Sequence, residues 1–154
     1  MTKRYVSVLV VSLSSPFLVG VYEDKKLIKS FCSSEKTSDE LPKIFDEIFS
    51  GFDVKELFFA RGPGSFMAIK VTYIFLKTLS ITKQIPIYAT DGFYFNDNSP
   101  IKAVGSRYFM KKDDIITTEI LKDNKEIKSF ELPTVLDKTI FSAEIEPLYV
   151  LPAV

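Results

Sequence analysis

Apolar and polar positions alternate over the first third of the chain, which predicts strands. The first stretch is mostly apolar on both of its faces, as VSVLVV at 6–11 shows, so it is expected to be buried. SSP at 14–16 and EDKK at 23–26 favour hairpin turns between the stretches. The predicted strands cover residues 5–13, 17–23 and 26–32.

A helical period follows. The apolar positions of that segment recur every three or four residues, and charged residues take the opposite face, so an amphipathic helix is predicted from about Ser38 to Phe49. Thr37 followed by Glu40 matches a capping box, and Gly51 is a suitable stop. The apolar positions are Leu41, Ile44, Phe45, Ile48 and Phe49.

The middle of the chain predicts a strand at 56–60, a long helix from about Ser65 to Thr82 and a strand at 85–89. Antiparallel strands first, and parallel strands joined by crossover helices afterwards, predict a mixed sheet covered by helices. The expected fold class is therefore α/β, with a ribonuclease-H-like lobe, the half-unit of the actin-like ATPase folds. The turn formers at 96–100 predict a hinge, which divides the chain into a lobe at 1–98 and a shortened β-rich second lobe at 99–154. In the second lobe, strands are predicted in 101–112, 115–132 and 146–151, with a hairpin turn at 122–125.

The long helix is apolar around most of its circumference, whereas a surface helix normally has a single apolar stripe. Lys70, Lys77 and Ser80 form the only clearly polar seam, with Tyr73 beside it. Two interpretations are open: the helix is covered within its own fold, or one flank is a subunit interface, because exposed apolar strips mark docking sites.

The RGPGS turn before this helix, at 61–65, also has two interpretations. Pro63 and Gly64 suit the second and third positions of a type II turn, and the Ser65 hydroxyl can cap the helix. Alternatively, the free amides at the helix start hold an anion such as phosphate.

Composition limits the chemistry. The 154 residues contain 20 basic and 20 acidic side chains, so no general basic face for nucleic acid is expected. The chain has no histidine, which excludes Ser-His and Cys-His pairs and histidine-based zinc sites. Cys32 is the only cysteine, and no signal peptide or membrane span is recognised, so a cytoplasmic location is expected.

The segment ARGPGSFMAIKVTYIFLKTLS at 60–80 resembles the GRGPGSFTGxRxGxxxAxGLA signature of the TsaB (YeaZ) family. LPKI at 41–44 resembles that family's LLPxI core, and EPLYVL at 146–151 resembles its xPxYLR ending. The resemblance extends from residue 4 to residue 95, and then is confined to Gly105–Arg107 and the end of the sequence.

The resemblance implies a non-catalytic scaffold subunit of the machinery that makes N6-threonylcarbamoyladenosine in tRNA, with no cofactor, metal or catalytic residue of its own. Family members bind the catalytic subunit TsaD through two helices, act together with the ATPase TsaE, and meet tRNA only indirectly. The turn of Gly62, Pro63 and Gly64 is then structural. The expected partner interface comprises Phe45, Phe49, Ser65, Phe66, Met67, Ile69, Lys70, Tyr73, Ile74, Leu76 and Lys77.

The sequence departs from the family pattern where an ATPase holds metal and phosphate, because Val11 replaces the usual Asp of the first strand. Alternatives remain open. The same helices could form a homodimer, or the chain could be a small phosphotransferase or nucleotide hydrolase that uses Asp24, Asp53 and Asp91. A protease activity lacks the metal-binding histidines of the catalytic relatives.

Overall fold

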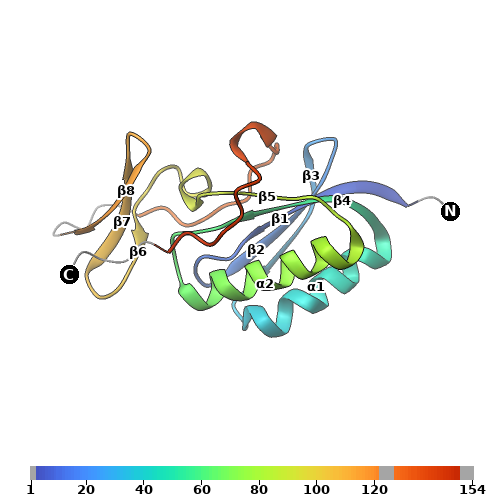
Figure 1. Ribbon diagram of the computed structural model, residues 1–154, viewed down its shortest axis with the longest axis horizontal. Helices are drawn as coiled ribbons and strands as arrows, with labels where there is room; N and C mark the ends of the chain where they lie inside the picture. The colour runs from blue at the N-terminus through green and yellow to red at the C-terminus, as the bar shows by residue number, and fades with distance from the viewer. Residues whose placement is uncertain (1–2, 122–126, 150–154) are drawn as a thin grey trace.

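A computed structural model describes residues 3–121 and 127–149. A five-stranded mixed sheet in the order β3-β2-β1-β4-β5 forms the centre, and a three-stranded antiparallel sheet in the order β6-β7-β8 lies at one end (Figure 1). The first sheet contains β1 (Arg4–Val11), β2 (Phe17–Glu23), β3 (Lys26–Ser33), β4 (Phe52–Ala60) and β5 (Ile87–Thr90). The helices are α1 (Thr37–Gly51) and α2 (Phe66–Lys83). The second sheet contains β6 (Ile101–Lys102), β7 (Arg107–Lys112) and β8 (Ile115–Ile120), and short 3₁₀ helices lie at Gly92–Phe95 and Lys138–Ile140.

The central strand β1 pairs antiparallel with β2 and parallel with β4, so that Val8 lies opposite both Val21 and Leu57. The predicted α/β class with a mixed sheet is therefore confirmed. The strand predicted at 56–60 is longer than expected and begins at Phe52, directly after α1. Its first residues are only half-buried, which is why the apolar pattern did not reveal them.

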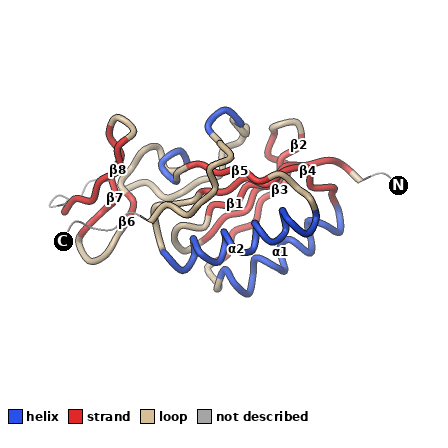
Figure 2. The backbone as a smooth tube through the Cα atoms, in the orientation of Figure 1, coloured by secondary structure: helices blue, strands red, loops and turns tan. Residues whose placement is uncertain are grey.

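Both helices cover one face of the five-stranded sheet and lie side by side (Figure 2). Each connects the carboxyl end of one strand to the start of another, so they run in the same direction and both begin at the edge nearest the small sheet (Figure 1). The core under them is apolar throughout, and a fully buried side chain of this kind contributes about 1.5–3 kcal/mol. It is built from Val6, Val8, Val10, Val19, Leu41, Phe45, Ile48, Leu57, Phe59 and Leu76, among others.

The other face of the sheet is covered by the first part of residues 127–149, here called the C-terminal strap, whose last residues reach α2 through Glu146 and Tyr149. Leu136 is buried against a second apolar cluster that includes Leu9, Val11 and Phe58. Main-chain bonds hold the strap to both edges of the sheet, since Leu27 N donates to Thr134 O at 3.0 Å, and Ala89 and Ser142 exchange two bonds of 2.9 Å. A segment with little regular structure thus takes the place of a helical layer.

The second sheet differs from the expectation in its turns. Its observed hairpin turns at Asp113 and Asp114, both with positive φ, between β7 and β8. The hairpin predicted at 122–125 lies outside the described residues. The strands predicted within 127–132 and 146–149 are wrong, because these residues run as irregular chain in the strap.

The start of α1 also differs from the prediction. Its N-cap is Lys36, without a side-chain cap, so the predicted capping box does not form. The Thr37 hydroxyl instead lies 3.2 Å from the Ser12 hydroxyl at the end of β1. Gly51 is the last helical residue, which agrees with the expected stop. Among the described residues, no helix combines the length and apolarity needed to cross a lipid bilayer.

A polar contact ties the strap to the centre of the sheet. Glu56 of β4 accepts hydrogen bonds from the Ser7 hydroxyl, at 2.7 Å, and from the Lys138 ammonium group. Burial tends to raise the pKa of the Glu56 carboxyl, but the bonds from Lys138 and Ser7 outweigh it and lower the pKa below its ordinary value. The folded state therefore favours the ionised carboxylate.

Replacing Glu56 by Gln is expected to lower the free energy of unfolding by about 1–2 kcal/mol at neutral pH. Because the folded pKa lies below the ordinary 4.5, the carboxylate stabilises the fold above pH 4.5, and this contribution is lost as the pH falls through the folded value. Urea unfolding as a function of pH should show a smaller acid-side loss in Glu56→Gln. The exposed Glu119→Gln is the matched control, and equal pH profiles for the wild type and Glu56→Gln would contradict this role.

Candidate functional site

The turn at 61–65 positions α2 because its main chain is bonded to three other parts of the fold. These bonds anchor the turn to the end of β1, to the end of β5 and to the strap. They run from Ser65 N to Leu13 O (2.9 Å), from Arg61 N to Thr90 O (2.9 Å), from Gly92 N to Gly62 O (2.9 Å) and from Leu148 N to Arg61 O (2.8 Å).

Two glycines in the turn allow this close packing. Gly62 has φ +133°, and a Cβ atom there would lie 2.5 Å from the Leu148 carbonyl oxygen. A Cβ atom on Gly64 would lie 2.6 Å from the Leu13 carbonyl oxygen. The predicted type II turn is wrong, because it needs positive φ at Gly64 and the structure has it at Gly62. The structural role expected for both glycines rests instead on close contact between main chains.

The helix begins as predicted at Ser65, whose hydroxyl accepts a hydrogen bond from Ala68 N at 3.5 Å. The Ser65 amide is already bonded to the Leu13 carbonyl. One of the amides that the anion interpretation requires is therefore engaged within the protein, which favours the structural interpretation of the turn.

The inner face of α2 packs on the sheet through Ile69, Thr72 and Leu76, all of which are buried. Phe45 of α1 is buried as well and contacts the Phe75 ring at a centroid distance of 5.3 Å. Three residues expected in the partner interface, Phe45, Ile69 and Leu76, are thus core residues and do not lie on the outer face of the helices. The helical wheel alone could not show which side of so apolar a helix meets the sheet.

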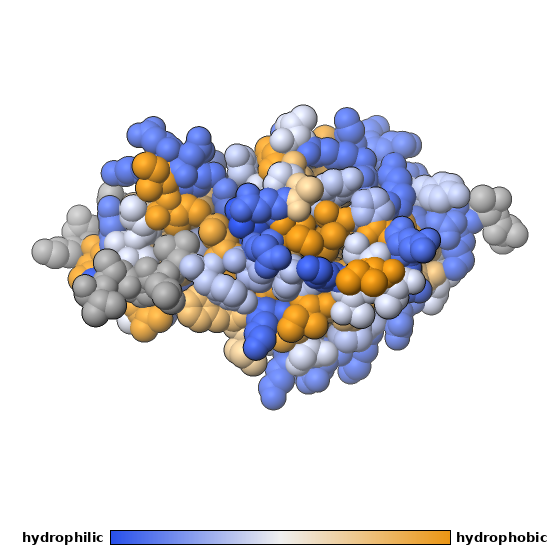
Figure 3. Space-filling view, in the orientation of Figure 1, coloured by the Kyte–Doolittle hydropathy of each residue, from blue (hydrophilic) through white to orange (hydrophobic). Residues whose placement is uncertain are grey.

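The outer face of α2 carries an apolar row that the rest of the described chain leaves uncovered. Met67, Ile74 and Ile81 are 71%, 53% and 67% exposed. They are spaced by seven residues, so they form a single line along the helix, as in the seam of a helical bundle. Apolar surface on this side of the molecule is interrupted by hydrophilic residues and is not continuous (Figure 3).

Polar groups flank this row on one side. Lys70 is exposed, while Lys77 donates a 2.9 Å hydrogen bond to the Tyr73 hydroxyl, which donates in turn to Glu146 of the strap at 3.3 Å. The bond to Tyr73 raises the pKa of Lys77.

Phe66 is half-exposed, and its ring packs edge-on against Tyr149 at 5.3 Å. Of the remaining predicted interface residues, Ser65 is exposed and Phe49 is half-buried beneath the Lys83 ammonium group.

Two hollows open at the start of α2, and Met67 contributes to both. One, of about 470 Å³, lies between the amino ends of α1 and α2; half of its lining residues carry hydroxyl groups, and Phe17, Met67 and Val71 contribute apolar surface. The other, of about 440 Å³, is mainly apolar and lies between α2 and the small sheet, with Leu13, Phe66, Val104 and Phe109 in its walls. The apolar row therefore continues past the end of the helix into a groove.

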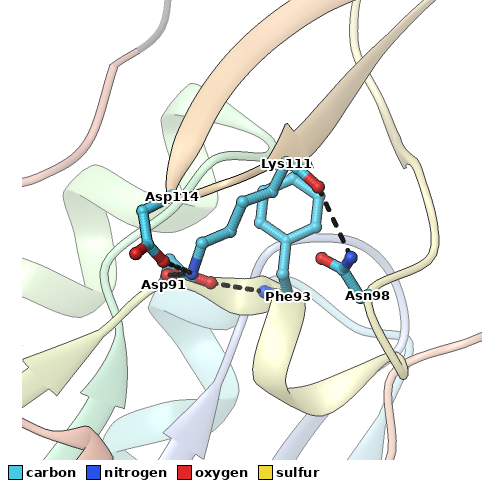
Figure 4. A network of polar contacts seen from close by, with 5 residues as sticks. All are labelled: Asp91, Phe93, Asn98, Lys111 and Asp114. Atoms are coloured by element: carbon cyan, nitrogen blue, oxygen red, sulfur yellow. Dashed lines mark hydrogen bonds and ion pairs between the residues drawn. The ribbon is translucent and has the colours of Figure 1, made fainter.

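A polar network at the junction with the small sheet engages one of the candidate carboxylates (Figure 4). Asp91 caps a 3₁₀ helix by accepting from Phe93 N at 2.9 Å, and its other oxygen pairs with Lys111 of β7 at 2.7 Å. Burial tends to lower the pKa of Lys111, but the pairing with Asp91 outweighs it and raises the pKa. Asp91 thus joins the two sheets, which is a structural role.

The other two candidate carboxylates lie elsewhere. Asp24 is in the β2–β3 turn and Asp53 pairs with Tyr5, so both are at the amino end of β1, whereas Asp91 follows the carboxyl end of β5. The structure does not bring the three together. Within residues 3–121 and 127–149, no three acidic or cysteine side chains are grouped so that they could hold a metal ion.

Comparison with solved structures identifies the fold. YeaZ from Pseudomonas aeruginosa aligns with a TM-score of 0.61 and 12% identity, over 86% of this chain and 72% of that one. The chain has a YeaZ-like fold. A second structure, described as an uncharacterized protein with similarity to peptidase YEAZ from Pseudomonas aeruginosa, aligns with a TM-score of 0.54 and 14% identity, over 77% of this chain and 64% of that one.

At the level of sequence, no protein-family model matches the chain, and no curated protein matches it. The likeness to YeaZ is therefore a likeness of fold, which agrees with the fold implied by the GPGSF motif.

Ile81 lies in the long helix but is not among the residues expected in the interface. Its distance of seven residues from Ile74, and of fourteen from Met67, was the available signal. The groove beside Val104 could not have been found in this way, because it depends on how the small sheet packs beside the start of α2.

The account of the turn predicts that Gly64→Ala lowers the free energy of unfolding by about 1–3 kcal/mol, because the new methyl group overlaps the Leu13 main chain. Gly51→Ala is the matched control, since nothing lies within 4 Å of a Cβ atom there. Chemical unfolding of both variants measures the difference. A Gly64→Ala protein as stable as Gly51→Ala would contradict the close packing of the turn.

Proposed function

We propose that this protein is a non-catalytic scaffold subunit of the machinery that makes N6-threonylcarbamoyladenosine in tRNA. It binds and stabilises a TsaD-type catalytic subunit through α1 and the outer face of α2. The ATPase TsaE joins the larger assembly, and tRNA is contacted through the other subunits. The assembly modifies tRNA in the cytoplasm.

The observation that carries the proposal is the exposed row of Met67, Ile74 and Ile81 on a helix of a YeaZ-like fold. Exposed apolar side chains in a line favour association with another helix. An interface of ordinary size buries about 800 Å² on each partner, which two adjacent helices can supply.

The residues available for chemistry support a scaffold rather than an enzyme. Val11 ends β1 where the related ATPases carry an acidic residue, and it is buried in the apolar cluster under the strap. The chain lacks histidine, and Asp91 is engaged with Lys111. The turn before α2 supports the helix through main-chain bonds.

Mixing the chain with TsaD from the same organism is expected to give a stable complex at micromolar concentration, measured as mass by light scattering. Ile74→Asp should weaken it at least about tenfold, because an unpaired carboxylate would be buried in the interface. Ile115→Asp on β8 is the matched control, since that isoleucine is 65% exposed on the small sheet. Absence of a complex with the wild-type chain would contradict the proposal.

A second candidate function is favoured by the hollow between the amino ends of α1 and α2, which hydroxyl side chains line. Helix amino ends attract phosphate groups, so a small phosphotransferase or nucleotide hydrolase of the actin-like class would hold its nucleotide there. Calorimetric titration with Mg-ATP distinguishes the two functions: the scaffold predicts no heat of binding, and clear saturable binding would favour the second function.

A further inference from the structure

The charges on α2 determine which kind of partner surface the helix can bind. The helix carries Lys70, Lys77 and Lys83, and it contains no aspartate or glutamate. We propose that the outer face of α2 binds a partner helix whose own apolar row is flanked, on the side that meets Lys70 and Lys77, by acidic side chains. This inference rests on the proposed function, because it describes the surface of the protein bound there.

The lysines lie on one definite flank of the row. Lys70 follows Met67 by three residues and Lys77 follows Ile74 by three, so both are displaced to the same side of the line. Tyr73 and Glu146 lie on that side too, since they form the chain of hydrogen bonds that begins at Lys77. Lys70 is exposed, and within the described chain it has no ion pair of its own. It is therefore available to a carboxylate on a second molecule.

The opposite flank differs in charge. Val71 and Thr78 follow the row members by four residues and point to the side where Phe75 contacts Phe45 of α1. Beyond them, the exposed face of α1 is acidic on balance, because Asp39, Asp46 and Glu47 outnumber Lys43, although Glu47 is already paired with Lys29 of β3. A partner helix with acidic side chains on both flanks would be repelled there. The surface thus selects a helix that is acidic on one flank only, and opposite charges fix its orientation.

The same charges act against pairing of two copies through α2. If two such helices meet row to row in antiparallel orientation, the same flank of each helix lies at one seam, so Lys70 and Lys77 of both chains approach each other, and neither α2 helix supplies an acidic residue to offset them. Like charges across an interface are unfavourable. A chain with an acidic flank is therefore preferred over an antiparallel second copy.

The test uses the full chain and two synthetic helical peptides of about three heptads each. The peptides share one apolar row and differ only in one flank, which is glutamate in one and lysine in the other. Fluorescence anisotropy of the labelled peptides measures binding. The glutamate peptide should bind at least about fivefold more tightly at low salt, and the difference should shrink at high salt.

Three variants make the test specific. Lys70→Glu should reduce or reverse the preference for the glutamate peptide, and Ile74→Asp should weaken the binding of both peptides. Lys112→Glu, an exposed lysine on the small sheet, makes the same charge change and should leave the preference intact. Circular dichroism verifies that each variant keeps the wild-type fold.

Equal binding of the two peptides, no binding of either, or an unchanged preference in Lys70→Glu would overturn the inference. A wild-type homodimer in sedimentation that Ile74→Asp dissociates would also overturn it, because a second copy would then occupy the face. Failure of the proposed function alone would give a different result, because the glutamate peptide would bind as predicted while TsaD of the same organism would not bind.

Discussion

Contact between main chains at the turn of Gly62 and Gly64 determines how α2 sits on the sheet. With no side chain at either position, the turn approaches the carbonyl groups of Leu148 and Leu13 and is bonded to the ends of β1 and β5. These contacts fix where the helix begins and how it is rotated about its axis. As a result Ile69 and its buried neighbours meet the sheet, and the row that contains Ile74 faces outward.

The strap explains how a chain of 154 residues covers both faces of its central sheet while the outer row of α2 stays exposed. A mixed sheet of this kind needs cover on both faces. Leu136 and its neighbours in the strap cover one face, and Glu56 with Lys138 fastens the strap across β4. The other face has α1 and α2, which the end of the strap contacts at Tyr73 and Phe66, and the row of Met67, Ile74 and Ile81 has no further layer from the described chain.

The sequence allowed the class of the fold and the strands and helices of the five-stranded sheet to be predicted, because these elements have clear periods of two or 3.6 residues and a recognisable turn at 61–65. It could not assign the inner side of α2, since Ile69 and Ile74 are equally apolar and only packing distinguishes them. The strap was missed because it has no period, and its role depends on contacts far apart in the chain, such as Tyr22 with Pro133. The capping box does not form because Lys36, and not Thr37, is the N-cap of α1, and the Thr37 hydroxyl lies 3.2 Å from the Ser12 hydroxyl.

Thiol labelling of α2 tests the central claim, that the outer row is open to solvent in the isolated chain. In a Cys32→Ser background, a cysteine replaces either Ile74 on the outer row or Ile69 on the inner face, and its reaction with a thiol reagent is followed over time. The account predicts that Ile74→Cys reacts at the rate of a free thiol and Ile69→Cys reacts only when the protein unfolds. Strong protection of Ile74→Cys in a chain shown to be monomeric would contradict it.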